Sequence, residues 1–422
     1  MERKNISWFP FSHVEILDRN HYLAKNTEGK VALFDGDHNA IINFGFYDSI
    51  IHADSESNYI MVRKNEKVGI INFDGDILLP LEYEDVSKGI NEELFPVKKD
   101  GKWGLVKTTG EWKIKPSFSY LYPLNDMLLS YKSGGYPQGV VNLKGKKITD
   151  AIFDRIEYAG ADFLYCETKR KEGVLDSKGT LILKPQFSGI HYSAENLFIV
   201  EKKTFANGLI NNIGKWIIKP TLKTIGNDFY DGLITAQFEG KYGALNPKGE
   251  WVITPEYELL FGFHNGLSAF KQDGMVGLLD LTGNVVLSPQ FELIGKQDIN
   301  GFFNAQKDGA TGLIDSKGNW IIEPKFDNLT CIGTGRYLIR TKERLYGVFN
   351  IDEHWIVKPE YDSIEPIGST EYFIIWTDRK YGLINASGTL SLEPTYQNIF
   401  QSNGWLVIKD ENKYGLLKLT NL

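Results

Sequence analysis

The chain has 422 residues, of which 42% are hydrophobic and 13% are aromatic, so it can bury a core rather than stay disordered. It carries 47 Lys and Arg residues against 54 Asp and Glu residues, which gives a net charge of −7. A dedicated nucleic-acid binder needs a basic face, and this balance argues against one. Two cysteines, Cys166 and Cys331, are too few for a disulfide framework or a cysteine-rich zinc site.

The first residues of the chain predict neither a signal peptide nor a membrane anchor. The segment from Met1 to Trp8 has no apolar signal core, and no apolar run reaches the roughly 18 residues of a membrane helix. We therefore expect a cytoplasmic protein. Residues 9–14 are typical of a lone strand, and residues 8–50 form a degenerate first repeat with Ala32 where later repeats have glycine.

From residue 69 onward, a glycine recurs every 33 to 35 residues. These repeat glycines are Gly69, Gly104, Gly139, Gly173, Gly208, Gly243, Gly277, Gly312, Gly347, Gly382 and Gly415. Other positions keep phase with them, as the repeat that contains Gly243 illustrates. Its Asn, second glycine, proline, aromatic and aliphatic positions are Asn246, Gly249, Pro255, Tyr257 and Leu260. A period of this length with many linked positions indicates a repeat architecture.

Each repeat is predicted to form three short antiparallel strands. The first, such as residues 94–99, turns at Asp100-Gly101, a two-residue hairpin signal, into the second at residues 103–106. An Asn/Asp-x-x-Gly turn follows, and then a third strand with period-two alternation, such as residues 251–257. Because proline lacks an N–H donor, we expect it at a strand end or a free edge. The repeat glycine would allow a close backbone approach to the neighbouring repeat.

The last repeat, residues 403–422, has only two strands, and the lone N-terminal strand could supply its third. Two all-β architectures are therefore open for a single array of about twelve repeats over residues 1–422. We favour an open, twisted solenoid, because twelve repeats exceed the four to eight blades of a typical propeller. The alternative is one or two β-propellers closed by the N-terminal strand, which would remove exposed strand edges.

The chain resembles the bacterial WG (KWG) repeat proteins. Lys102-Trp103-Gly104-Leu105 carries the signature of that family, and a Tyr variant stands at Tyr242-Gly243, Tyr381-Gly382 and Tyr414-Gly415. The resemblance extends over roughly residues 8–422. It implies a β-repeat protein of bacterial origin and is weak for function.

No catalytic, cofactor-binding or metal-binding residues are expected. The seven histidines lack metal-ligand spacing, and no Gly-x-Ser-x-Gly elbow, phosphate loop or dinucleotide fingerprint occurs. Turn chemistry explains the periodic Asn and Asp residues without calcium. The position that begins strand three holds Trp in some repeats and Leu or Val in others, which favours the core over a sugar-stacking surface. Its tryptophans are Trp112, Trp216, Trp251, Trp320 and Trp355.

These observations favour a non-enzymatic scaffold that holds a protein partner through a long repeated surface. Variable connectors after strand three, such as residues 226–231 and 365–370, are where recognition is expected. The aromatic content leaves a glycan or cell-envelope binding module as an alternative. A third alternative is an enzyme with a site at a propeller channel, which predicts carboxylates and histidines clustered at one mouth.

Overall fold

The computed structural model describes residues 6–52, 57–202, 206–352, 354–368 and 371–421. These residues form twelve small antiparallel sheets, eleven with four strands and one with three, which confirms the predicted all-β class. The contacts between residues divide the chain into two compact units. We call them the terminal unit, Met1–Gln186 with Asn398–Leu422, and the middle unit, Phe187–Gln397. In the described part of the chain, no helix is long and apolar enough to cross a membrane.

Six sheets belong to the terminal unit, and each runs through its strands in chain order except the last. They are β2 (His13–Ile16), β3 (His21–Lys25), β4 (Val31–Asp35) and β5 (Ala40–Ile42); β6 (Ser49–His52), β7 (Tyr59–Lys64), β8 (Lys67–Asn72) and β9 (Ile77–Tyr83); β10 (Asp85–Val86), β11 (Leu94–Lys99), β12 (Lys102–Lys107) and β13 (Trp112–Phe118); β14 (Tyr120–Pro123), β15 (Leu128–Lys132) and β16 (Gly139–Asn142); β17 (Arg155–Gly160), β18 (Phe163–Thr168), β19 (Lys171–Asp176) and β20 (Leu181–Phe187); and β45 (Asn398–Ser402), β46 (Trp405–Asp410), β47 (Lys413–Lys418) and β1 (Ser7–Phe9). A 3-10 turn, η3 (Leu419–Asn421), follows β47.

Six further sheets form the middle unit, again with consecutive strands side by side. They are β21 (Gly189–Ser193), β22 (Leu197–Glu201), β23 (Asn207–Asn211) and β24 (Trp216–Leu222); β25 (Thr224–Ile225), β26 (Ile234–Phe238), β27 (Lys241–Leu245) and β28 (Trp251–Tyr257); β29 (Leu259–Leu260), β30 (Leu267–Gln272), β31 (Met275–Asp280) and β32 (Val285–Phe291); β33 (Leu293–Gln297), β34 (Phe303–Lys307), β35 (Ala310–Ile314) and β36 (Trp320–Phe326); β37 (Asn328–Gly333), β38 (Arg336–Arg340), β39 (Tyr346–Asn350) and β40 (His354–Tyr361); and β41 (Ser363–Ile367), β42 (Tyr372–Thr377), β43 (Lys380–Asn385) and β44 (Leu390–Tyr396). A 3-10 turn, η2 (Ala194–Asn196), precedes β22.

The prediction of three strands per repeat is one strand short. The connector after the third predicted strand contains a further short strand that pairs with the next repeat, as β10 pairs with β11. The in-phase aliphatic residue lies in this strand, where Val86, Leu121 and Ile364 are buried. A sheet of four consecutive strands, which ten of the twelve described sheets show, is a propeller-type blade.

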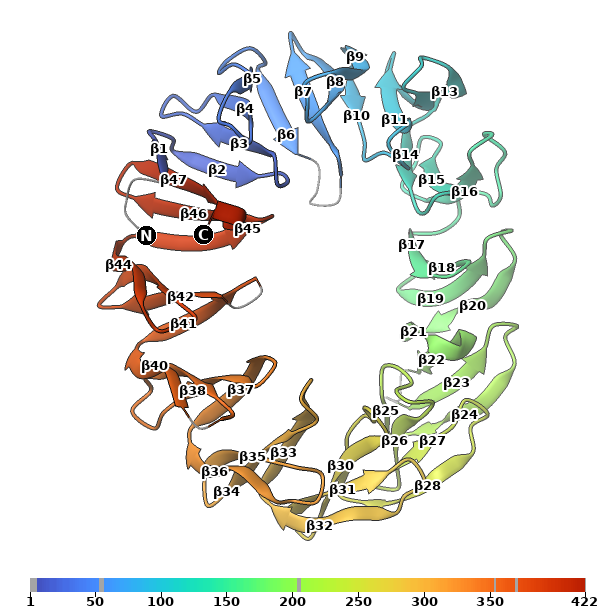
Figure 1. Ribbon diagram of the computed structural model, residues 1–422. Coiled ribbons are helices and arrows are strands. Elements are labelled where there is room, and N and C mark those ends of the chain that lie inside the picture. Colours follow the sequence, from blue (N-terminus) through green and yellow to red (C-terminus); the bar gives the residue numbers. More distant parts are fainter. Residues whose placement is uncertain (1–5, 53–56, 203–205, 353, 369–370, 422) are drawn as a thin grey trace. The chain divides into compact units, whose positions relative to one another are not determined.

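The N-terminal strand completes the last sheet. Ser7 pairs with Leu416 and Phe9 with Tyr414, so β1 adds to the free edge of β47 (Figure 1). The adjoining sheets share a core that includes Phe11, Tyr22 and Trp405. This closure is the one predicted for β-propellers closed by the N-terminal strand, and the favoured open solenoid is not confirmed. The physical reason is that closure removes an edge that would otherwise leave backbone N–H and C=O groups unpaired.

Most repeat glycines lie under a bulge in the last strand of their own sheet, whereas Gly139 lies in the three-stranded sheet and Gly415 lies opposite Trp8 of β1. In the sheet of β12 and β13, Trp103 pairs with Phe118 but Leu105 pairs with Ile114, so the bulged strand has two extra residues. A Cβ atom on Gly104 would lie 2.5 Å from the Ile114 carbonyl oxygen. The close approach therefore comes from the same sheet, and the expectation that it comes from the neighbouring repeat is wrong.

The in-phase proline lies within this bulge on the outermost strand, as Pro116 does in β13. Since that strand is the last in its sheet, the missing N–H faces no partner strand. The prediction of a free-edge proline is confirmed. The same proline protects the edge against pairing with another chain.

Contacts between adjacent sheets come from the second glycine and from aromatic side chains. Gly249 has φ +79°, and a Cβ atom on it would lie 2.7 Å from Ile217 Cγ2 of the preceding sheet. The Phe291 ring meets the Trp320 ring of the next sheet at 5.5 Å, with 84° between the ring planes. Trp320 is partly buried against the shared core, which is the place expected for these tryptophans.

The periodic Asn and Asp residues form Asx turns, as predicted. Asp280 Oδ1 accepts hydrogen bonds from the Thr282 and Asn284 backbone N–H groups at 2.8 and 2.9 Å. Asn246 makes the same pair of bonds to Lys248 and Glu250. Each turn thereby satisfies backbone donors between the last two strands of its sheet.

A second carboxylate position, which the sequence analysis did not single out, supports the hairpin between the second and third strands. It lies fifteen residues after the repeat glycine and accepts from the turn N–H. Glu84 bonds Gly101 N–H at 3.0 Å, Glu258 bonds Asp273 N–H at 3.1 Å, and Glu292 bonds Gly309 N–H at 3.1 Å. Because the hairpin residues adopt positive φ, as Asp273 does at 50°, an external acceptor helps hold them there.

The close approach at the repeat glycine predicts a large penalty for any side chain. In Gly277→Ala the new Cβ atom would lie 2.3 Å from the Leu287 carbonyl oxygen, so the bulged strand has to shift. We expect a loss of about 1–3 kcal/mol of unfolding free energy, measured by urea denaturation with Trp fluorescence. Gly189→Ala is the control, because its Cβ atom would meet only Glu201 at 3.5 Å. Equal effects of the two substitutions would contradict the bulge argument.

The Asx turn at Asp280 predicts that substitution by Asn preserves the stability of the protein, whereas substitution by Ala lowers it. Asp280→Ala should cost about 1 kcal/mol at pH 7, whereas Asp280→Asn should be near neutral, because Asn keeps the acceptor.

Hydrogen bonds from the Thr282 hydroxyl and the Asn284 amide help lower the pKa of Asp280 from 3.8 to about 2. A lowered folded pKa gives stability above pH 4 that is lost as the pH falls toward 2. The wild type should therefore lose stability relative to Asp280→Asn as the pH falls from 4 toward 2, measured as the midpoint of urea unfolding. Midpoints of the two proteins that change equally with pH would contradict this prediction.

Candidate functional site

The repeat glycines and the two cysteines lie in or beside the strands of the sheets. The repeat glycines lie inside sheets, and Cys166 is buried, which raises the pKa of its thiol to about 12. Cys331 is only half-buried, and burial raises its pKa as well. Across the described ranges, no group of three or more His, Cys, Asp or Glu side chains is arranged to hold a metal ion.

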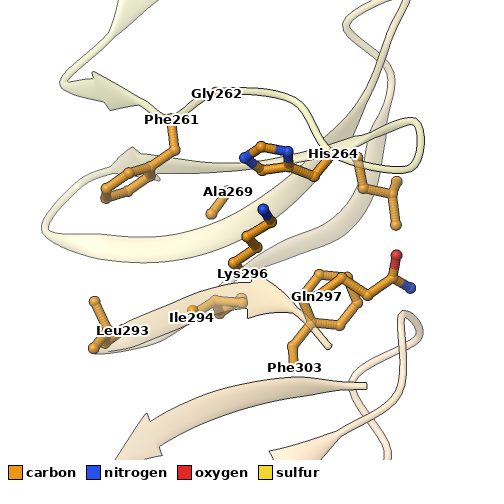
Figure 2. Close-up of a pocket in the computed structure, with 11 residues that line it drawn as sticks. Phe261, Gly262, His264, Ala269, Leu293, Ile294, Lys296, Gln297 and Phe303 are labelled. Carbon is orange, nitrogen blue, oxygen red and sulfur yellow. The ribbon is translucent and has the colours of Figure 1, made fainter. Parts of the chain in front are cut away.

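A pocket of about 290 Å³ lies in the middle unit between two adjacent sheets (Figure 2). One wall comes from the loop after β29 and from β30, with Phe261, Gly262, His264, Leu267 and Ala269. The other wall comes from β33 and β34, with Leu293, Ile294, Gly295, Lys296, Gln297 and Phe303. The lining is mostly apolar, with a few polar groups, as is usual for binding sites.

A bulge in β33 sets the position of Lys296. The β33–β34 register runs from Ile294 opposite Ala305 to Gln297 opposite Phe303, so Gly295 and Lys296 together oppose one residue. Bulges re-aim side chains, and Figure 2 shows Lys296 rising from β33 toward His264. Gln297 then ties the strand end to the opposite wall, because its Oε1 accepts from Asn265 Nδ2 at 3.1 Å.

A tight turn holds His264 over the pocket. The His264 N–H donates to the Leu267 carbonyl at 2.9 Å, and the two residues between them, Asn265 and Gly266, have φ of 52° and 80°. The Gly266 N–H donates to Asp231 Oδ2 of the preceding sheet at 2.8 Å. The His264 ring therefore stands on a turn fixed from both sides.

The environment of His264 favours its neutral form. Burial lowers the pKa of the imidazole, and the nearby Lys296 charge lowers it further, while Asp231 acts in the opposite direction. At neutral pH, the pocket thus offers one ammonium group, on Lys296, and one uncharged imidazole.

Exposed apolar side chains surround the mouth. Leu293 is 50% exposed, Phe261 41% and Tyr230 45%, and the Tyr230 ring lies 4.9 Å from that of His264. By contrast, Ile294 and Phe303 are buried and form the floor. We call Tyr230, Phe261 and Leu293 the apolar rim.

A second hollow lies in the terminal unit where the first and last sheets meet, and it is polar. Its lining includes His38, Trp405 and Lys418. The His38 Nδ1 atom lies 3.2 Å from the buried Tyr22 hydroxyl, and Lys418 lies over the Trp405 ring, so these groups already have partners inside the protein. The middle-unit pocket is the better candidate, because Lys296 and His264 have no side-chain hydrogen bond to any residue that the structure describes.

The sequence analysis did not identify this pocket. The seven histidines were noted only for their lack of metal-ligand spacing, and neither His264 nor Lys296 was singled out. A signal was present in the first strand of that repeat, where Gly295-Lys296 interrupts an apolar start at Leu293-Ile294. One interruption among many variable connectors does not distinguish a bulge from a loop. β33 lies in a connector after the third predicted strand, the kind of segment where recognition is expected, and that expectation stays a prediction.

Comparison with known proteins gives one family. The model of the WG containing repeat matches residues 69–103, 103–126, 173–203, 208–242, 242–275, 277–309, 312–341, 346–374 and 381–414. No curated protein matches the chain.

The solved structures give remote likenesses. A eukaryotic initiation factor is 13% identical with a TM-score of 0.35, over 71% of this chain and 95% of that one. BamB from Moraxella catarrhalis is 14% identical with a TM-score of 0.30, over 70% and 92%. Hsv2p from Kluyveromyces lactis is 11% identical with a TM-score of 0.30, over 60% and 94%. Because the repeat model matches more than half of the residues, this chain belongs to the family of proteins built from the WG containing repeat.

Proposed function

We propose that this protein is a non-enzymatic bacterial scaffold that holds a protein partner, and that the middle-unit pocket with its apolar rim is a contact site. The observation that carries the proposal is the apolar rim itself. Phe261 and Leu293 line the hollow and are 41% and 50% exposed, and Tyr230, which contacts His264 of the lining, is 45% exposed. Grouped exposed apolar surface of this kind marks interaction sites.

The size of the pocket favours a protein segment over a free small molecule. A volume of about 290 Å³ is at the lower end for small-molecule sites, which bury most of their ligand. The apolar rim extends beyond the hollow, and Ile299 adds a further exposed apolar residue in the loop after β33. A small ligand in the hollow would leave this surface in water, whereas a protein partner would cover it.

The rigidity of the walls supports the same function. The two sheets share a buried core that includes Leu278, Ile294 and Phe303. Strands that are packed in this way hold the pocket in one shape before binding. Preorganisation of a surface lowers the entropy that a partner loses on binding.

A glycan-binding module is the second candidate, favoured by tyrosines in the terminal unit. Tyr122 in β14 and Tyr158 in β17 are exposed on the first strands of consecutive sheets. The Tyr122 ring also stacks on Tyr120 at 6.3 Å with 11° between the planes. An exposed aromatic face of this kind can receive a sugar ring.

The glycan candidate predicts quenching or protection of aromatic fluorescence by cell-wall polysaccharide, and loss of that effect in Tyr122→Ala. Tyr136→Ala is the control, because this exposed residue lies in the hairpin between β15 and β16, away from the stacked pair. A glycan array without hits would remove this candidate.

The protein-partner candidate predicts site-specific cross-linking at the rim. A photo-reactive amino acid at position 293 should give a discrete protein adduct in the cell that makes this protein. The same group at position 285 should not, although Leu293 and Val285 are similarly exposed at 50% and 53%. Val285 lies on the outermost strand β32, outside the pocket. Adducts of equal yield at both positions, or none at 293, would contradict the proposal.

A further inference from the structure

We infer that the middle-unit pocket receives one large apolar side chain of a partner protein together with an adjacent carboxylate, which Lys296 and His264 bind. This inference rests on the proposed function and deepens it, because it names the chemistry of the partner. The two parts of the site, an apolar floor and a basic edge, carry it together.

Lys296 provides the charge. It lines the pocket, and in the described part of the chain it has no ion pair and no hydrogen bond. None of the described lining residues is Asp or Glu. In a protein of net charge −7, an ammonium group left unpaired beside apolar walls is complementary to an anion.

His264 provides a second donor on the opposite wall. Its ring nitrogens have no hydrogen-bond partner among the residues that the structure describes, and its ring is held by the tight turn and by contact with Tyr230. A neutral imidazole still donates one N–H. Figure 2 shows the His264 ring and the Lys296 side chain directed toward the same space, where a carboxylate could bond both.

The buried apolar floor of the pocket explains why the partner should carry a large apolar side chain next to its carboxylate. Ile294 and Phe303 are buried, and Ala269 and Phe261 flank them in the lining. A large apolar side chain that fills this space removes water from around Lys296. Exclusion of water strengthens the attraction between Lys296 and the carboxylate beyond that of an exposed ion pair.

The experiment uses the full chain and four labelled, capped octapeptides. The first is Gly-Ser-Gly-Trp-Asp-Gly-Ser-Gly, and the others replace Trp-Asp by Trp-Asn, Ala-Asp or Trp-Lys. We expect the Trp-Asp peptide to bind about tenfold more tightly than the Trp-Asn and Ala-Asp peptides at low salt, by fluorescence anisotropy. The Trp-Lys peptide should bind most weakly of the Trp peptides.

Two variants assign the preference to the pocket. Lys296→Met keeps the apolar stem and removes the charge, so the preference for Trp-Asp over Trp-Asn should disappear while both peptides still bind. Lys307→Met is the matched control, because Lys307 lies at the far end of β34 and does not line the pocket. This variant should keep the tenfold preference. Circular dichroism confirms that both variants are folded.

Three results would overturn the inference. One is equal affinity for Trp-Asp and Trp-Asn, or no binding of Trp-Asp up to millimolar concentration. Another is a preference that survives Lys296→Met. The third is binding of indole-3-acetate as tight as that of the Trp-Asp peptide, which would assign the pocket to a small acid. If cross-linking at position 293 succeeds in any of these cases, the protein-partner proposal stands while the carboxylate preference falls.

Discussion

The architecture depends on one close contact that recurs in most of the sheets, in which the outermost strand bulges over a glycine of the strand beside it. At Gly104 and Gly277 the distance from a hypothetical Cβ atom to the crossing carbonyl is 2.5 and 2.3 Å, which no side chain tolerates. The bulge increases the local twist and carries an in-phase proline such as Pro116. Both consequences, a twisted blade and a protected edge, follow from the missing side chain.

The stacking of sheets depends on a separate set of contacts. The second glycine lets the Asx turn of one sheet lie against an aliphatic residue of the sheet before it. At Gly283, for example, a Cβ atom would lie 3.4 Å from Ile253 Cγ1. Aromatic pairs such as Phe291 and Trp320 fill the space beside it. The pocket lies between two sheets of this kind, so the repeat sets the distance between its walls. Polar side chains of its lining, such as His264 and Lys296, come from the variable segments around the first strands.

Features that recur from repeat to repeat can be predicted from the sequence, whereas features confined to one repeat cannot. Turn chemistry at Asp280, the free-edge proline and the complementary terminal strands follow from local rules that recur along the chain. Some first strands are hidden, because β10, β25 and β29 have two residues each and therefore no alternation to detect. The pocket is hidden for another reason. Lys296 becomes a pocket residue only through a register shift against β34, which is a tertiary property.

The pairing of Ser7 with Leu416 also dictates an order of events during synthesis on the ribosome. Every other sheet draws its strands from one stretch of nascent chain and can assemble as that stretch emerges. The sheet of β45, β46 and β47 must wait for a strand that precedes all its other strands in the chain, so β1 has to stay unpaired, or pair elsewhere, until β47 appears. Unpaired strands are prone to aggregate, so β1 needs protection for the whole interval between its own synthesis and that of β47.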